Sequence, residues 1–159
     1  MATDGFTTCL WYDDQAEEAA HHYVSIFKNS SIGDVARYPE GTPHRAGTVM
    51  TVEFTANGHK FLALNGGPQF KFTEAVSFMI FCADQEEIDY YWTKLTEDGE
   101  PGPCGWLKDK YGVSWQVVPD RLQDMITDPD PAKVARVTEA FMAMTKFDIA
   151  TLDQAYAGE

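Results

Sequence analysis

One short phrase occurs twice in this chain, and this repeat constrains the fold more than any other feature. Residues 13–26 are DDQAEEAAHHYVSI and residues 83–95 are ADQEEIDYYWTKL, and each copy follows a short apolar run. When Ala16 is left out, the Asp-Gln and Glu-Glu pairs of the two copies fall in register. Two copies about 70 residues apart are too few and too widely spaced for a solenoid. The repeat therefore predicts a duplicated module.

The spacing of apolar residues predicts the same order of elements in each half. The first half has strand-like segments at 6–12, 31–38, 48–55 and 60–65, with a helix after the first that Asp13 or Asp14 would cap. The second half has strands at 75–82, 104–108 and 114–118, a weaker strand before the prolines at 101–103, and a helix at 85–96. We predict an α+β fold with two tandem βαβββ modules, at about 5–68 and 74–120, within one domain spanning 1–159.

A helical tail at about 121–157 has no counterpart in the first half. It begins with a short helix near 119–126, and Asp130-Pro131 then opens a helix that we expect to run to about Lys146. Asp148 caps a last helix through Tyr156. The apolar stripe of Val134, Val137, Phe141 and Met144 must cover either the sheet or a partner subunit.

Charge and composition exclude several classes of function. The net charge of −13 argues against a nucleic-acid partner, because such partners require a basic surface. No apolar stretch is long enough to span a membrane, and the N-terminal residues lack the pattern of a signal peptide. The chain has an odd number of cysteines, which are Cys9, Cys82 and Cys104. This number predicts reduced thiols in a cytoplasmic protein, with Cys9 and Cys82 buried against the helices.

Three stretches resemble one branch of a known superfamily: residues 9–19, residues 64–68 and residues 105–119. They look like the PhnB-like branch, the so-called 3-demethylubiquinone-9 3-methyltransferase domain, of the vicinal-oxygen-chelate superfamily, which is also called the glyoxalase/bleomycin-resistance/dioxygenase superfamily. The resemblance implies curled mixed sheets, a pocket formed by paired modules, and a homodimer. The methyltransferase label itself has no support, because the glycine turns at 57–58 and 66–67 join or end strands instead of opening a helix.

The resemblance also implies where a metal would bind. Relatives that use a metal keep ligands at positions that we align with Thr8, Ser77, Ala63 or Asn65, and Gln116. Hydroxyl and amide groups are weak ligands for such metals, so we expect neither a metal nor another cofactor. Adjacent His21 and His22 cannot share one ion on a helix.

Strand alternation predicts a pocket that combines aromatic and polar side chains. If Gln116 faces this pocket, Ser114 lies on the same side. Glu53 is a candidate base or ligand anchor, with a solvent-facing position as the alternative. The same aromatic residues could instead fill the core without leaving a cavity. The residues predicted to bind a ligand are Thr8, Tyr12, Glu53, Asn65, Ser77, Met79, Phe81, Trp106 and Gln116.

Three hypotheses for function follow from these observations. The first is a protein that binds a small organic molecule in a metal-free pocket. The second is a metal-dependent lyase, isomerase or dioxygenase of the vicinal-oxygen-chelate type, with Glu53 and either His59 or Asn65 as ligands. The third is a structural or interaction role with a vestigial pocket. The sequence leaves open whether the chain catalyses a reaction and which molecule it binds.

Overall fold

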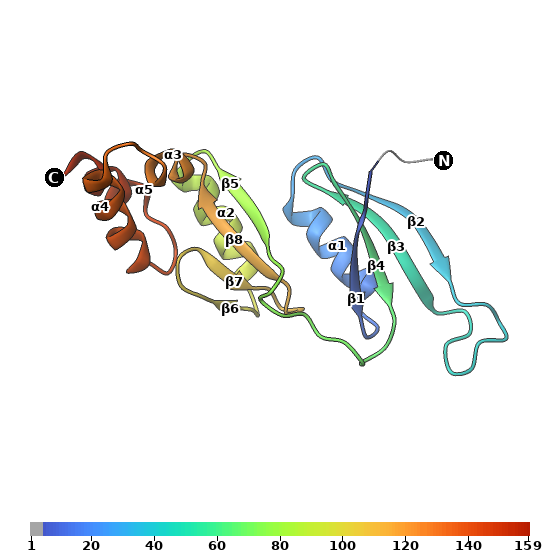
Figure 1. Ribbon diagram of the computed structural model, residues 1–159. Helices are drawn as coiled ribbons and strands as arrows, with labels where there is room; N and C mark the ends of the chain where they lie inside the picture. The colour runs from blue at the N-terminus through green and yellow to red at the C-terminus, as the bar shows by residue number, and fades with distance from the viewer. Residues whose placement is uncertain (1–4) are drawn as a thin grey trace. The chain divides into compact units, whose positions relative to one another are not determined.

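The chain contains two compact units, each built around the predicted βαβββ module (Figure 1). The computed structural model describes residues 5–159, with one unit ending at Lys71 and the other spanning Phe72–Glu159. The elements of the first unit are β1 (Thr8–Tyr12), α1 (Ala16–Ile26), β2 (Ser31–Arg37), β3 (Val49–Ala56) and β4 (His59–Asn65). Those of the second are β5 (Phe78–Cys82), α2 (Gln85–Thr96), β6 (Glu100–Pro101), β7 (Trp106–Lys108), β8 (Ser114–Pro119), α3 (Leu122–Ile126), α4 (Pro131–Met142) and α5 (Ile149–Ala157). The predicted α+β architecture with a helical tail is confirmed.

Each module forms a four-stranded mixed sheet with the same topology. The strand orders are β1-β4-β3-β2 and β5-β8-β7-β6, and only the β1–β4 and β5–β8 pairs are parallel within the described residues. Because a parallel pair needs a crossover connection, the helix that follows the first strand packs against one face of its sheet. We call the opposite face of each sheet its open face.

Aromatic side chains fill the space between α1 and the first sheet. Tyr23 is buried and stacks on Phe54, with ring centroids 5.9 Å apart, and Phe54 stacks in turn on Phe61 at 5.0 Å. The helix presents Ala19 and Ala20 to the same face, and their small side chains let its backbone approach the strands closely. Burial of such rings supplies a large part of the stability of a module.

The two copies of the repeated phrase begin their helices by different means. Asp84 caps α2, because its Oδ1 accepts a hydrogen bond of 2.9 Å from the Glu87 backbone N–H. The prediction that Asp13 or Asp14 caps α1 is wrong, since the residue at that position is Gln15 and its side chain makes no capping bond. Asn65 at the end of β4 caps α1 instead: its Oδ1 accepts from the Ala16 N–H at 2.8 Å.

The helical tail belongs to the second unit and packs on its own elements. Asp130 and Asp148 cap α4 and α5 as predicted. The apolar stripe of α4 packs within this unit, with Val137 fully buried against its neighbours, so dimerisation stays a prediction. The helix ends at Met142 and not near Lys146, because residues 144–145 form backbone hydrogen bonds with another loop. Across residues 5–159, the helices are too short or too polar to cross a bilayer.

Candidate ligand-binding site

The second unit contains a cavity of about 420 Å³, which is within the usual range for small-molecule sites. Its walls come from the turn before β5, from β6 and the turn after it, from β7, and from the start of β8. The lining residues are Glu74, Glu100, Pro101, Gly102, Pro103, Trp106, Leu107, Lys108 and Ser114.

Two hydrogen-bond donors lie side by side in this cavity. Lys108 on β7 pairs directly with Ser114 on β8, so their side chains are cross-strand neighbours on one face of the sheet. Ser114 is only 1% exposed, and its hydroxyl has no hydrogen-bond partner among the described residues. Buried polar groups are nearly always paired in proteins. The Ser114 hydroxyl is therefore an available donor beside the Lys108 ammonium.

Trp106 supplies the apolar surface next to these donors. It lies two residues before Lys108 on β7, and strand alternation puts both side chains on the same face. The indole is partly exposed and lines the cavity together with Pro101 and Pro103. A tryptophan face beside prolines suits the flat or apolar part of an organic molecule.

Glu74 already forms an ion pair with Lys108, with 2.5 Å between its Oε1 and the Lys108 Nζ. The hydrogen bond from Lys108 lowers the pKa of Glu74, and the same bond raises the pKa of Lys108. Both groups are therefore charged at neutral pH. The Glu74 side chain is 61% exposed and that of Lys108 is 35% exposed, so water competes with the pair.

The tail braces the wall of the cavity that follows β6. The Cys104 N–H donates to the Met144 carbonyl at 2.8 Å, and the Gly105 N–H donates to the Thr145 carbonyl at 2.7 Å. The Gly105 carbonyl accepts from the Val117 N–H at 2.8 Å, which ties the same residue to β8. The loop between Pro103 and Trp106 is thus held from both sides.

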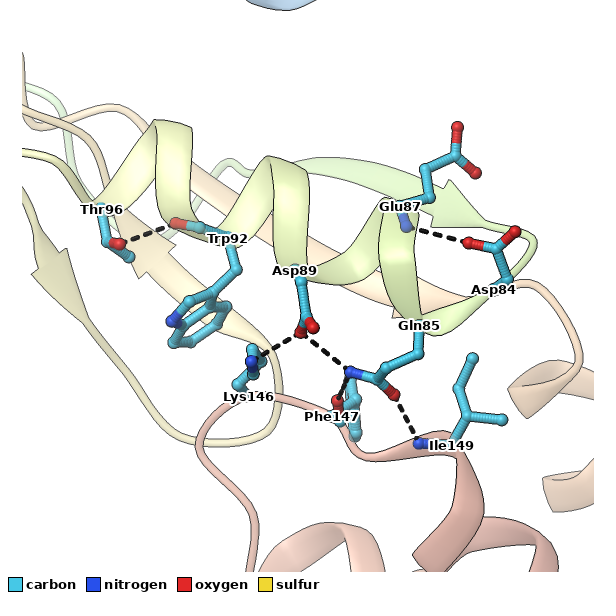
Figure 2. Close-up of polar contacts among 9 residues, drawn as sticks. All are labelled: Asp84, Gln85, Glu87, Asp89, Trp92, Thr96, Lys146, Phe147 and Ile149. Atoms are coloured by element: carbon cyan, nitrogen blue, oxygen red, sulfur yellow. Dashed lines mark hydrogen bonds and ion pairs between the residues drawn. The ribbon is translucent and has the colours of Figure 1, made fainter.

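The other end of this tail segment is fixed to α2, as Figure 2 shows. The Gln85 amide donates through Nε2 to the Phe147 carbonyl at 3.1 Å and accepts through Oε1 from the Ile149 N–H at 2.9 Å. Asp89 accepts from the Lys146 Nζ at 2.6 Å. Residues 144–149 therefore connect the cavity wall to the helix that covers the other face of the sheet.

The predicted site residues of the second module lie together on its open face. Gln116 donates through Nε2 to the Ser77 Oγ at 2.9 Å, and Gln116 is in register with Met79 and with Trp106 on its two neighbouring strands. Met79 and Phe81 are exposed on this face. Of these five residues, Trp106 lines the cavity, and the binding role of the others stays a prediction.

The predicted residues of the first module do not gather in the same way. Thr8, Tyr12 and Asn65 lie on the helix-covered face, because they alternate with the exposed Cys9 and with Leu62 and Leu64 on the open face. The inward orientation that we considered for them is not the one observed, and their role in binding a ligand stays a prediction. The Thr8 Oγ1 lies 3.0 Å from the His59 Nε2, Tyr12 is buried, and Asn65 caps α1.

Glu53 lies exposed on the open face of the first sheet, in register with Leu62. His59 and Asn65 alternate with Leu62 and Leu64 on β4, so they lie on the opposite face from Glu53. The structure therefore separates Glu53 from both residues that we paired with it as alternative metal ligands. The exposed position that we considered for Glu53 is the one observed.

The first unit has its own cavity of about 380 Å³ near the start of α1, and Asn65 is part of its lining. Three of its lining residues are bonded to one another. The Arg45 Nη1 donates to the Tyr38 hydroxyl at 3.2 Å and to the Asn65 carbonyl at 2.8 Å, and the Tyr38 hydroxyl donates to the same carbonyl at 2.6 Å. The remaining lining includes the acidic side chains of Asp13, Asp14 and Glu17.

A shift of one residue explains the misplaced positions in the first module. The parallel ladders end on the pairs Tyr12–Asn65 and Cys82–Pro119, so Tyr12 is equivalent to Cys82 and Thr8 to Phe78. Ser77 is then equivalent to Thr7, not to Thr8 as the aligned phrases suggested. Because side chains alternate along a strand, this shift of one residue reverses the face on which a residue lies.

Sequence reasoning missed three charged residues of the cavity, which are Glu74, Glu100 and Lys108. Alternation could have found Lys108, since it follows Trp106 by two residues in a predicted strand. No local signal marks Glu74, which lies in a turn and reaches Lys108 only through the folded structure.

The side chains at the positions where relatives keep metal ligands do not fit a transition metal. Ser77 and Gln116 bond to each other, and Leu62, the counterpart of Gln116 in the first sheet, has no donor atom. Within residues 5–159, the His, Cys, Asp and Glu side chains form no group of three that could hold an ion.

The three cysteines differ in their surroundings. Cys82 is buried, and burial followed by the charges of Glu87, Asp84 and Asp120 raises its pKa to about 12. The prediction that Cys9 is also buried is wrong, because Cys9 points to the open face of the first sheet and is exposed. Partial burial nevertheless raises the pKa of Cys9. High pKa values keep both thiols protonated at neutral pH.

The two βαβββ modules define the class of protein, because their fold is that of the vicinal-oxygen-chelate superfamily. The amino-acid sequence identifies one family within this superfamily. Residues 4–118 match the family model described as 3-demethylubiquinone-9 3-methyltransferase, and the chain belongs to this PhnB-like family.

Solved structures agree with this assignment. The PhnB protein from Bacillus cereus is 39% identical, with a TM-score of 0.64 over 72% of this chain and 98% of that chain. Protein PA1353 from Pseudomonas aeruginosa is 15% identical, with a TM-score of 0.62 over 74% and 98% of the two chains. The fosfomycin resistance protein FosX from Listeria monocytogenes is 17% identical, with a TM-score of 0.50 over 78% and 97%. The last two share the fold alone, and a comparison with curated proteins gave no match.

Proposed function

We propose that this protein binds a small organic molecule in the cavity of its second module. The observation that carries the proposal is the pair of donors in that cavity, the buried Ser114 hydroxyl and the Lys108 ammonium, beside the partly exposed ring of Trp106. A few convergent polar groups in an apolar cavity are the usual features of a small-molecule site. A cavity of about 420 Å³ lined by these groups also favours binding over a purely structural role.

The residue types and their positions on the sheets favour this function over the metal-dependent alternative. Amide and hydroxyl groups at the strand positions are poor ligands, and Glu53 lies on the other face from His59 and Asn65. The descriptive name of the family suggests methyl transfer, which in a typical enzyme uses a doubly wound parallel sheet. The mixed four-stranded sheets of residues 5–159 differ from that arrangement.

Titration with 2-phenylethanol, followed by NMR on the full chain, tests the proposed site. This neutral probe has the size of a fragment and a ring that can contact Trp106. We expect the Trp106 indole signal to shift on binding and Trp106→Ala to weaken binding about tenfold, as loss of an aromatic contact would. Trp92→Ala is the matched control, since Trp92 lies on α2 and outside the cavity. Shifts that do not involve Trp106, or equal losses in the two variants, would contradict the proposal.

The metal content of the purified protein provides a second, independent measurement. We expect well below one equivalent of zinc, nickel, iron or manganese when the protein is prepared without chelators. A stoichiometric metal ion would favour the enzyme hypothesis over simple binding.

A further inference from the structure

The arrangement of charges in the cavity carries information about the ligand itself. Of the lining residues in the described part of the chain, Lys108 is the only one with a positive charge. Its backbone is fixed between two neighbours, since Lys108 pairs with Glu100 on β6 and with Ser114 on β8. The ammonium and the unpaired hydroxyl of Ser114 are therefore donors held on adjacent strands, where one acceptor group can reach both.

Glu74 shows which kind of acceptor suits the Lys108 ammonium. Its carboxylate contacts the Lys108 Nζ at 2.5 Å, although Glu74 comes from a turn outside the sheet and most of its side chain is exposed. An exposed ion pair of this kind contributes little to stability. A carboxylate from outside can therefore replace Glu74 at small cost, because the exchange conserves the charge around Lys108 and returns Glu74 to water.

The rest of the lining limits what can be attached to this carboxylate. Trp106, Pro101 and Pro103 offer an apolar surface beside the donors. Glu100 faces Lys108 from the other side and disfavours a second negative charge on the ligand. The cavity thus suits a single anionic group on a flat or apolar body.

We propose that the natural ligand is a small monocarboxylate with an apolar or aromatic body, and that its carboxylate displaces Glu74 to bind Lys108 and Ser114. In the free protein Glu74 acts as an internal substitute for the ligand carboxylate. This inference rests on the proposed function, because it assigns a ligand class to the same cavity.

Three probes with the same phenyl ring separate the contribution of charge from that of shape. Phenylacetate is an anion, 2-phenylethanol is neutral and 2-phenylethylamine is a cation. We expect the unmodified protein to bind phenylacetate most tightly and the amine most weakly, and the affinity for phenylacetate to fall with added salt. Because Glu74→Gln removes the competing carboxylate, it should tighten phenylacetate binding about tenfold and leave 2-phenylethanol binding unchanged.

Three further variants serve as comparisons. Lys108→Met should abolish the preference for phenylacetate over 2-phenylethanol, while the ring contact with Trp106 remains. Glu97→Gln makes the same change in net charge as Glu74→Gln at an exposed position outside the cavity, and should leave all three affinities unchanged. Ser114→Ala should weaken phenylacetate binding more than 2-phenylethanol binding.

The outcomes distinguish this inference from the proposed function. If 2-phenylethanol shifts the Trp106 signal but Glu74→Gln does not improve phenylacetate binding, the assignment of an anionic ligand is wrong and the cavity remains a binding site. If the amine binds most tightly, Glu74 and Glu100 recognise a cation and the inference is overturned. If none of the three probes affects Trp106, the proposed function fails together with it.

Discussion

The replacement Asn65→Ala should destabilise the first module more than the loss of a small polar side chain suggests. The Asn65 side chain joins two elements, because its Oδ1 accepts from the Ala16 N–H at 2.8 Å and its Nδ2 donates to the Val49 carbonyl at 3.1 Å. It is 7% exposed, so water cannot easily replace either partner. Alanine removes both hydrogen bonds at once.

The expected loss follows from these two bonds. Removing a helix cap costs about 1 kcal/mol. Leaving a buried backbone group without its partner costs about 1 to 3 kcal/mol. We therefore expect Asn65→Ala to lower the free energy of unfolding of the first module by about 2 to 4 kcal/mol. With a urea dependence of about 2 kcal/mol per molar, the midpoint would fall by about 1 to 2 M.

Urea denaturation followed by circular dichroism measures this change, and hydrogen exchange in α1 assigns it to the first module. Asp84→Ala is the matched cap variant in the second module, where a single capping bond predicts a loss of about 1 kcal/mol. Asp14→Ala should change stability by less than about 0.5 kcal/mol, as a surface replacement does. If Asp14→Ala costs as much as Asn65→Ala, then Asp14 caps α1 and the argument from Asn65 is refuted.

Two further predictions concern the second module. Gly105→Ala places a Cβ 2.4 Å from the Phe147 ring at a backbone φ of +76°, whereas Gly112→Ala has a similar φ of +85° and open space around it. We expect Gly105→Ala to cost about 2 kcal/mol more than Gly112→Ala, and equal melting temperatures would show that the tail does not pack there. Because the pKa of Cys82 is raised to about 12 in the folded protein, the thiol ionises first in the unfolded chain, and stability falls as the pH rises from about 9 to 12. Between pH 8 and pH 10 this loss should be about 1.4 kcal/mol, and denaturation curves of Cys82→Ala should lack it. A Cys82→Ala variant with the same pH dependence as the unmodified protein would contradict the raised pKa.

Most of the fold could be predicted because apolar periodicity and the repeated phrase gave consistent indications. The hairpin between β3 and β4, for example, turns at Asn57-Gly58, where both residues have positive φ as the dipeptide suggests. The caps Asp130 and Asp148 could be predicted because each lies directly before the helix that it caps. Asn65 could not be predicted as a cap, because it lies 49 residues along the chain from Ala16, whose N–H donates to its side chain. Capping by a distant residue depends on the tertiary fold and leaves no local pattern.

The candidate site was less predictable than the fold for a related reason. Successive side chains of a strand point to opposite faces of the sheet. Because we treated Thr8, and not Thr7, as the equivalent of Ser77, the orientation expected for the strand residues of the first module was reversed. In the second module, alternation within each strand was enough to predict that Ser77, Gln116 and Trp106 share one face, and they do. The ion pair of Glu74 with Lys108 joins a turn to a strand, and no pattern in the neighbouring sequence predicts it.

The brace formed by residues 144–149 bears on how ligand assignments can be transferred among relatives. The family match ends at residue 118, whereas the segment that holds the loop at Cys104 and Gly105 lies beyond it. Two proteins can therefore agree throughout the matched modules and still differ in the stiffness and position of one cavity wall. A ligand identified for a relative with another tail should be tested against this chain before it is assigned to it.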